Sequence, residues 1–111
     1  MQWRRVAVAK ITDIPPDQGL TVPLSETREC TLFVHKGRCY AVGSLCPHQN
    51  APLCNGVLEG DDVLICRRHG FRFSLQTGEC LTLGGYGIPT YPVEIEEASG
   101  TIFVRFLDDS P

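Results

Sequence analysis

The feature that most constrains this chain is a pair of short segments that each place one cysteine close to one histidine. The first segment contains Cys46 and His48, and the second contains Cys66 and His69. Seventeen residues separate His48 from Cys66, so the spacing is C-x-H-x17-C-x2-H. Neither segment alone supplies enough ligands for a metal centre. A fold that brings the two segments tip to tip would supply two thiolates and two imidazoles, which predicts a metal centre.

This spacing, and the sequence around it, resemble the Rieske family. The match is detailed from Cys46 to about Gly78, in the segments CPHQNAPL and NGVLEGDDVLICRRHGFRFSLQTGE, and looser elsewhere. The resemblance implies one [2Fe–2S] cluster per chain, in which two histidines replace two cysteines on one iron. It also implies that Cys46 and Cys66 bind one iron, and that His48 and His69 bind the other.

A zinc site is the alternative interpretation, because Zn²⁺ also accepts two cysteines and two histidines in tetrahedral geometry. The usual zinc fingers pair two cysteines in one hook and two histidines in the other. Here each segment contains one residue of each kind, so we favour the cluster over a structural or storage module that holds zinc.

Length and charge limit the other possibilities. We expect residues 1–111 to form a single domain, and the Rieske resemblance adds a cluster-binding subdomain at about residues 44–83. A net charge of −3 and an isoelectric point near 5.5 argue against a nucleic-acid partner. The first residues contain no apolar run long enough for a signal peptide or a membrane helix, so we expect a cytoplasmic protein without a membrane partner.

Short apolar segments separated by Gly and Pro predict antiparallel β structure. Expected strands cover residues 3–11, 20–24, 62–65, 71–75 and 79–81, with hairpins over 29–43 and 91–106. In the first hairpin, which turns at Lys36-Gly37, Val34 should face Cys39 and Leu32 should face Ala41. In the second, Val93 and Ile95 should point inward. The fold class expected is all-β, a Rieske fold with an antiparallel sandwich or barrel and a small inserted cluster-binding subdomain.

Residues 83–92, LGGYGIPTYP, contain too much Gly and Pro for a regular strand. The Rieske resemblance implies a third, proline-containing loop that covers the cluster at this place. A plain connector between strands is the alternative interpretation.

Four cysteines and one histidine lie outside the predicted ligand set. Cys39 lies on the apolar face of its predicted strand, so we expect it in the core. Cys54 lies in the first ligand segment, and we expect it to be buried beside the cluster rather than to bind it. His35 lies at a hairpin turn and should be exposed. The sequence assigns no role to Cys30 or Cys80.

The resemblance also predicts a low reduction potential. Respiratory Rieske proteins join the ligand loops by a disulfide at places that correspond to Ala51 and Arg68 here. They also direct Ser and Tyr hydroxyls at the cluster sulfurs, at places that correspond to Phe71 and Phe73. Donors of this kind stabilise the reduced state, so their absence should lower the potential. Two cations, Arg67 and Arg68, should oppose this with a smaller effect.

No catalytic triad, phosphate loop or second metal site is recognisable, so we expect an electron-transfer component with no substrate site of its own. The resemblance implies a ferredoxin that carries one electron from an NAD(P)H-dependent flavoprotein reductase to a terminal oxygenase. The alternative is the small subunit of NAD(P)H nitrite reductase, which the opening WRRVAVAKITDIPPDQGLTV also resembles. Its partner would be the large reductase subunit.

Overall fold

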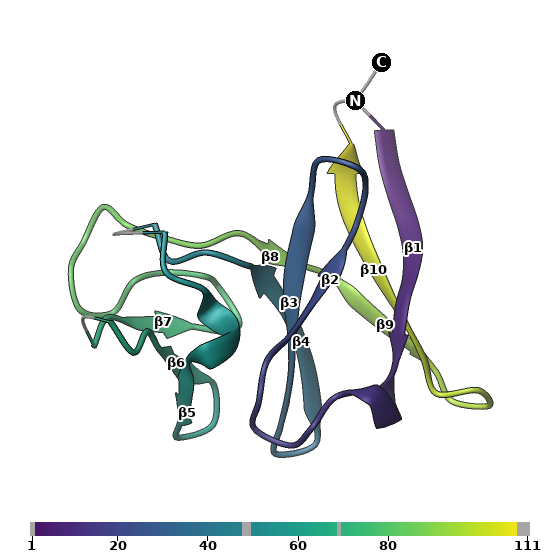
Figure 1. Cartoon of the computed structure of the whole chain (residues 1–111), viewed down its shortest axis with the longest axis horizontal. Coiled ribbons are helices and arrows are strands. Elements are labelled where there is room, and N and C mark those ends of the chain that lie inside the picture. Colours follow the sequence, from purple (N-terminus) through teal and green to yellow (C-terminus); the bar gives the residue numbers. More distant parts are fainter. Residues whose placement is uncertain (1, 48–49, 69, 109–111) are drawn as a thin grey trace.

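The computed structural model describes residues 2–47, 50–68 and 70–108, which form three antiparallel β-sheets (Figure 1). The first sheet has the order β1-β10-β9, with β1 at Gln2–Lys10, β10 at Thr101–Asp108 and β9 at Val93–Glu96. The second has the order β2-β3-β4-β8, with β2 at Leu20–Pro23, β3 at Glu29–His35, β4 at Arg38–Gly43 and β8 at Thr90–Tyr91. The third has the order β5-β6-β7, with β5 at Val57–Glu59, β6 at Val63–Ile65 and β7 at Arg72–Ser74. Two 3-10 turns are η1 at Ile11–Asp13 and η2 at Leu53–Asn55. This confirms the expected all-β class.

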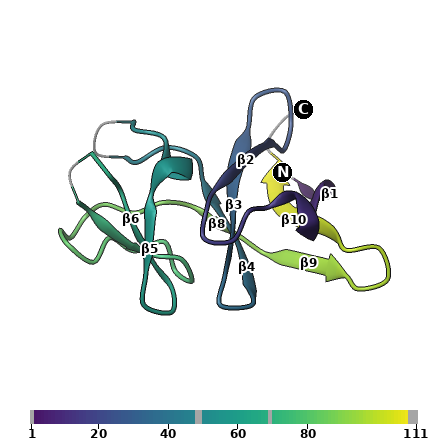
Figure 2. The ribbon, with the colours of Figure 1, turned by 60° about the horizontal axis from the view of Figure 1, so that its bottom comes forward.

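The β3–β4 hairpin lies between the other two sheets in both ribbon views (Figures 1 and 2). Its register is the predicted one, with Val34 opposite Cys39 and Leu32 opposite Ala41. Lys36 and Gly37 both have positive φ, 50° and 78°. Two such residues in succession form the tight turn whose twist matches the flanking strands, so the Lys-Gly pair fixes this register.

The two faces of this hairpin are buried in two different cores. Successive side chains of a strand point to opposite faces of the sheet, so adjacent residues enter different cores. Leu32 and Ala41 pack with the buried side chains of the first sheet, which are Ile102, Val104 and Phe106. Phe33 and Val42 pack with a second group that includes Cys46, Leu53, Leu64, Cys66 and Phe73. The hairpin therefore separates the core of the first sheet from the core that contains Cys46 and Cys66.

The chain after β7 differs from the expected pattern in two places. Residues 79–81 form no strand; Cys80 makes a single bridge to Phe73, and Glu79 pairs with Gly87 instead. Residues 83–92 were expected to exclude a strand, yet they end in β8, which pairs with Ala41 and Val42. Prolines at positions 89 and 92 flank this strand and lack an N–H group, which limits it to two residues.

The last hairpin forms as expected, but one of its side chains is placed differently. Ile95 was expected to point into the core and is 43% exposed, although its partner Ile102 is fully buried. β9 is paired only with β10 among the described strands, and Figure 2 shows it extending away from the β3–β4 hairpin. The third sheet lies within residues 44–83, but the boundaries of a subdomain, and the single domain itself, stay predictions.

Candidate metal centre

Backbone hydrogen bonds join the described residues at the two ends of the first cysteine segment, which runs from residue 46 to 51. Cys46 N–H donates to the Ala51 carbonyl at 2.8 Å, and Asn50 N–H donates to the Cys46 carbonyl at 2.7 Å. A bridge between Leu45 and Pro52 closes the base of the loop. Asn50 has a φ of 55°, in the left-handed region that Asn tolerates better than most residues.

The second segment, residues 66–71, repeats this arrangement. Cys66 N–H donates to the Phe71 carbonyl at 2.8 Å, and Gly70 N–H donates to the Cys66 carbonyl at 2.8 Å. Pairing of Ile65 with Arg72 closes its base. Gly70 has a φ of 71°, and apart from its chain neighbours no atom of the described residues lies within 4 Å of the place where a Cβ would stand. The backbone angle therefore accounts for this glycine, and the predicted close approach to a cluster stays a prediction.

The two loops are matched in length, in hydrogen bonds and in the position of the left-handed residue. Each begins with its cysteine, and each has the left-handed residue four places later. We did not recognise this equivalence in the sequence. The available signal was that Asn50 and Gly70 occupy the same place in the two loops, and that both residue types tolerate positive φ.

Cys46 and Cys66 are each only 2% exposed, and both belong to the core that includes Phe73. Two buried cysteine side chains at the start of matched loops fit the soft donors that an iron–sulfur cluster requires. His48 and His69 lie outside the described residues, so the four-ligand set stays a prediction. Within the described residues, no three His, Cys, Asp or Glu side chains form a group that could hold a metal ion.

One arginine connects the second loop to the end of the first ligand segment. Arg67 Nε donates to the Asn55 carbonyl, at the end of η2, at 2.5 Å. Arg68 is exposed and Ala51 is buried, and neither can form the disulfide that joins the loops in respiratory relatives. The Arg67 hydrogen bond is therefore a non-covalent connection between the two halves of the site.

An aromatic pair joins the end of the second loop to the glycine-rich stretch. The rings of Phe71 and Tyr86 meet edge to face, with centroids 6.1 Å apart and planes at 61°. Tyr86 belongs to the glycine-rich stretch at residues 83–92, so this stretch contacts the second loop. Phe73 is fully buried in β7. Neither phenylalanine carries a hydroxyl, as the sequence indicated. That residues 83–92 cover the cluster stays a prediction.

Three of the remaining cysteines belong to the two cores or pack against them. Cys30 is fully buried, and burial raises the pKa of its thiol to about 12. Cys39 is half-buried against the same core, where burial raises its thiol pKa to about 11. Thiols with such values stay protonated and unreactive at neutral pH. Cys80 is buried in the core that holds Cys46 and Cys66.

Cys54 differs from its expected position. It is only half-buried, its Sγ lies 3.9 Å from Asn55 Oδ1, and it lines a hollow next to Gly19 and Arg67. The 3-10 turn η2 explains the difference, because it buries Leu53 and leaves the next side chain at the edge of the core.

His35 was expected to be exposed, and this prediction is wrong. Its side chain is 7% exposed, and both ring nitrogens have partners. Nδ1 lies 2.5 Å from Asp17 Oδ1, and Nε2 lies 2.7 Å from the Gly60 carbonyl. Both partners lie far away in the sequence, so no local pattern could have indicated this burial.

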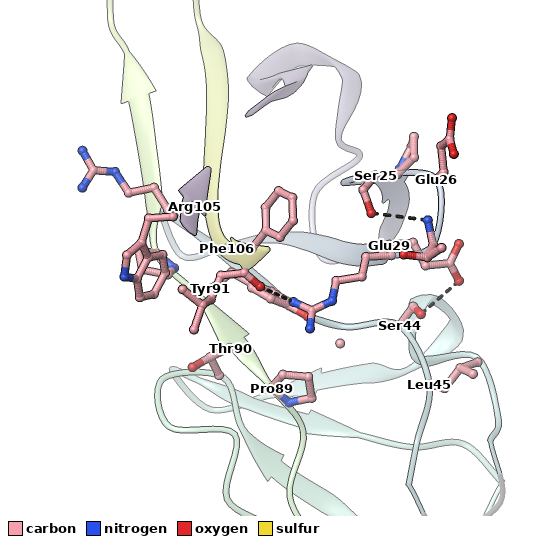
Figure 3. Close-up of a pocket in the computed structure, with 17 residues that line it drawn as sticks. Ser25, Glu26, Glu29, Ser44, Leu45, Pro89, Thr90, Tyr91, Arg105 and Phe106 are labelled. Carbon is pink, nitrogen blue, oxygen red and sulfur yellow. Dashed lines mark hydrogen bonds between the residues drawn. The ribbon is translucent and has the colours of Figure 1, made fainter. Parts of the chain in front are cut away.

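A hollow of about 840 Å³ lies between the first and second sheets (Figure 3). Ser44 donates to Glu29 on one side, and Arg28 donates to the Leu107 carbonyl. The described residues that line it include no cysteine or histidine, so it does not belong to the metal centre. No helix among the described residues is long and apolar enough to span a membrane.

Three antiparallel sheets and two matched cysteine loops define a small β protein built to hold an inorganic cofactor. The family model of the Rieske [2Fe-2S] domain matches residues 4–92. This chain therefore belongs to the Rieske family, and its cofactor is a Rieske-type [2Fe–2S] cluster. The prediction of a cluster rather than zinc is confirmed.

Relatives across the family agree with this assignment. The 3-phenylpropionate/cinnamic acid dioxygenase ferredoxin subunit of Escherichia coli (strain K12) is 32% identical over 108 residues, which is 96% of this chain and 98% of that protein. A structure described as the NADH-dependent nitrite reductase small subunit from Mycobacterium tuberculosis has a TM-score of 0.82 at 24% identity, over 96% of each chain. A chain from the complex of reduced oxygenase and oxidized ferredoxin in carbazole 1,9a-dioxygenase has a TM-score of 0.76 at 26% identity, over 90% of this chain and 91% of that one.

Proposed function

We propose that this protein is a one-electron carrier whose cluster is bound by Cys46, His48, Cys66 and His69. The observation that supports it most is the pair of matched loops, each of which begins with a buried cysteine. These residues would hold a Rieske cluster, which would supply reversible one-electron transfer.

Contacts and burial around the loops support this proposal. Arg67 connects the second loop to the first ligand segment, and the edge-to-face contact of Phe71 with Tyr86 covers part of the second loop with apolar surface. Both thiols lie in an apolar core, which excludes water from the sulfur ligands. A rigid, water-poor site changes little on electron transfer, which suits a carrier rather than an enzyme with its own substrate.

Cofactor analysis of the purified protein tests the ligand set. We expect two irons and two acid-labile sulfides per chain, and an electron-spin resonance signal with a lower average g value than all-cysteine clusters give. Cys46→Ala, His48→Ala, Cys66→Ala and His69→Ala should each abolish or badly destabilise the cluster, because each removes one ligand.

Cys54→Ser and Cys39→Ala are the matched controls, because neither thiol is a predicted ligand. Both variants should keep the iron and sulfide content of the wild type. A colourless Cys54→Ser protein, or stoichiometric zinc without labile sulfide in the wild type, would show that the ligand assignment is wrong.

For the partners, we infer a flavoprotein reductase that uses NAD(P)H as electron donor and a terminal oxygenase as acceptor. The support is the full-length similarity to a dioxygenase ferredoxin subunit at 32% identity. The similarity at 26% identity to a chain from an oxygenase–ferredoxin complex agrees with it. The alternative is the small subunit of a nitrite reductase, which the TM-score of 0.82 keeps open as a matter of fold.

The genes next to the coding sequence separate these two functions. Adjacent genes for an oxygenase and a flavoprotein reductase support the ferredoxin role. An adjacent gene for a large sirohaem reductase contradicts it and supports the nitrite reductase subunit. Reduction of the purified protein by the neighbouring reductase and NAD(P)H then tests the donor directly.

A further inference from the structure

The β3–β4 hairpin meets the third sheet at His35, a residue that the proposed electron transfer does not use. Its imidazole contacts Asp17, in the loop between η1 and β2, and Gly60, in the turn between β5 and β6. These partners lie 18 and 25 residues away in the sequence. One buried side chain thus joins three separate segments of the chain.

The two contacts require two protons on the ring. The Gly60 carbonyl can only accept a hydrogen bond, so Nε2 must carry a proton. An ionised Asp17 carboxylate can also only accept, so Nδ1 must carry one as well. A neutral imidazole has a single N–H and would leave Nδ1 facing the lone pairs of the carboxylate at 2.5 Å. The observed geometry therefore fits an imidazolium.

The charges around the ring partly cancel. The His35 imidazole contacts Asp17, and the other titratable residues that line the same hollow are Lys36, Arg38, Tyr40, Asp61 and Asp62. Lys36 Nζ donates to Asp61 Oδ1 at 3.1 Å, but both side chains are exposed, so this ion pair contributes little. The hydrogen bond that Nδ1 donates to the Asp17 carboxylate raises the pKa of His35 above its ordinary value. The Gly60 carbonyl adds to this, and burial and Lys36 oppose it.

We propose that protonated His35 is a positioning residue that clamps the β5–β6 turn onto the β3–β4 hairpin. The β5–β6 turn leads through β6 directly into Cys66, so the clamp also fixes the strand that carries the second loop. The effect on a ligand loop rests on the proposed function, whereas the clamp itself does not.

The pH dependence of this clamp has a definite sign. A group whose pKa is raised in the folded state stabilises the fold below its unfolded pKa of about 6.5, and this contribution is lost as the pH rises through the folded pKa. The clamp is therefore closed below the raised pKa of His35. It weakens above that value, when Nδ1 loses its proton.

Asp17→Asn tests the proton on Nδ1 without removing the contact. Asp17 has a φ of 60°, which Asn also tolerates, and the Asn amide can donate to a neutral Nδ1. Nitrogen-detected NMR of the intact protein with its cluster should show His35 titrating above pH 6.5 in the wild type and below the wild-type value in Asp17→Asn. Asp61→Asn is the matched control, because it removes a neighbouring carboxylate that bonds Lys36 instead.

A wild-type His35 that titrates at or below its ordinary pKa overturns the proposal. So does an Asp61→Asn variant that lowers the His35 pKa as much as Asp17→Asn does, because the cause would then be the general field of the acidic residues. The iron and sulfide contents are measured in the same samples. A wild-type protein without iron and sulfide would refute the ligand assignment, whereas the His35 titration tests the clamp alone.

Hydrogen exchange tests the clamp itself. After correction for the intrinsic exchange rate, the β5 and β6 amides of the wild type should lose protection as the pH rises through the His35 pKa. His35→Gln keeps a donor for the Gly60 carbonyl but carries no charge, so its protection should not change over this range. Protection that is independent of pH in the wild type, or that falls equally in His35→Gln, contradicts the clamp.

Discussion

Phe71 is the residue at which the predicted low potential can be tested. It lies at the end of the second loop, half-buried against Tyr86. The Rieske resemblance implies that respiratory members have a hydroxyl donor at this place. Phe73, the second such place, is fully buried in the core. A hydroxyl at position 73 would be buried among apolar side chains, so position 71 is the one that can be tested without damage to the core.

Phe71→Ser should raise the midpoint potential, because a hydroxyl donor stabilises the additional negative charge of the reduced state. The wild type should lie near the bottom of the Rieske range, about −150 mV. Arg68→Leu should lower the potential by a smaller amount, because an exposed cation is screened by solvent. For a one-electron couple, about 59 mV corresponds to a tenfold change in the equilibrium constant.

Protein-film voltammetry at neutral pH measures both effects. A wild-type midpoint above zero would contradict the assignment of the sulfur environment, and the reductase partner with it. Phe71→Leu, which keeps an apolar side chain without a hydroxyl, controls for loss of the contact with Tyr86 and should leave the midpoint close to the wild-type value.

At the scale of elements, the connection after β7 depends on one glycine. Gly78 has a φ of 78°, and its N–H donates to the Ser74 carbonyl at 2.8 Å. Its own carbonyl accepts a hydrogen bond from Ile88 N–H, also at 2.8 Å. A Cβ at this position would stand 1.9 Å from the Ile88 carbonyl oxygen. This close approach holds the glycine-rich stretch against the turn that follows β7.

Gly78→Ala should therefore destabilise the protein by about 2 kcal/mol or more, because the alanine adds both left-handed strain and a backbone clash. Gly84→Ala is the matched control, because its φ is not positive and, among the residues that the structure describes, no atom beyond its chain neighbours lies within 4 Å of its Cβ position. It should change the free energy of unfolding by less than about 0.5 kcal/mol. Urea unfolding measures both variants, and equal effects would contradict the close approach of Ile88 to Gly78.

At the scale of the whole molecule, the β3–β4 hairpin divides the interior into two cores. Leu32 and Phe33 are neighbours in the sequence, and both are fully buried, but they enter different cores. The core of Phe33 contains both predicted cysteine ligands, and the core of Leu32 contains neither. A change in the core of Leu32 should therefore affect the stability of the protein without disturbing the predicted cluster site.

Leu32→Ala and Phe33→Ala should each reduce the free energy of unfolding, by roughly 2–5 and 3–5 kcal/mol. Only Phe33→Ala opens a cavity beside the cysteine loops, so it should also increase the rate at which a chelator bleaches the visible absorption of the cluster. The rates are compared at equal fractions of folded protein. Equal bleaching in the two variants would show that the cores are not separate.

Local chemistry made much of this protein predictable from its sequence. The spacing of Cys46, His48, Cys66 and His69 led to the family, and the Lys36-Gly37 turn led to the register of the central hairpin. Both are short-range signals, because a ligand loop or a tight turn is specified by a few adjacent residues. The all-β class followed from the alternation of apolar residues between turns.

Tertiary structure decided the features that depend on residues far apart in the chain. The burial of His35 between Asp17 and Gly60, the pairing of β8 with β4 and the connection from Arg67 to Asn55 each join segments that local pattern does not relate. The physical reason is that side-chain burial and long-range hydrogen bonds depend on which surfaces meet after folding. The sequence therefore determined the loops and their chemistry, and the packing of the three sheets determined how those loops are held.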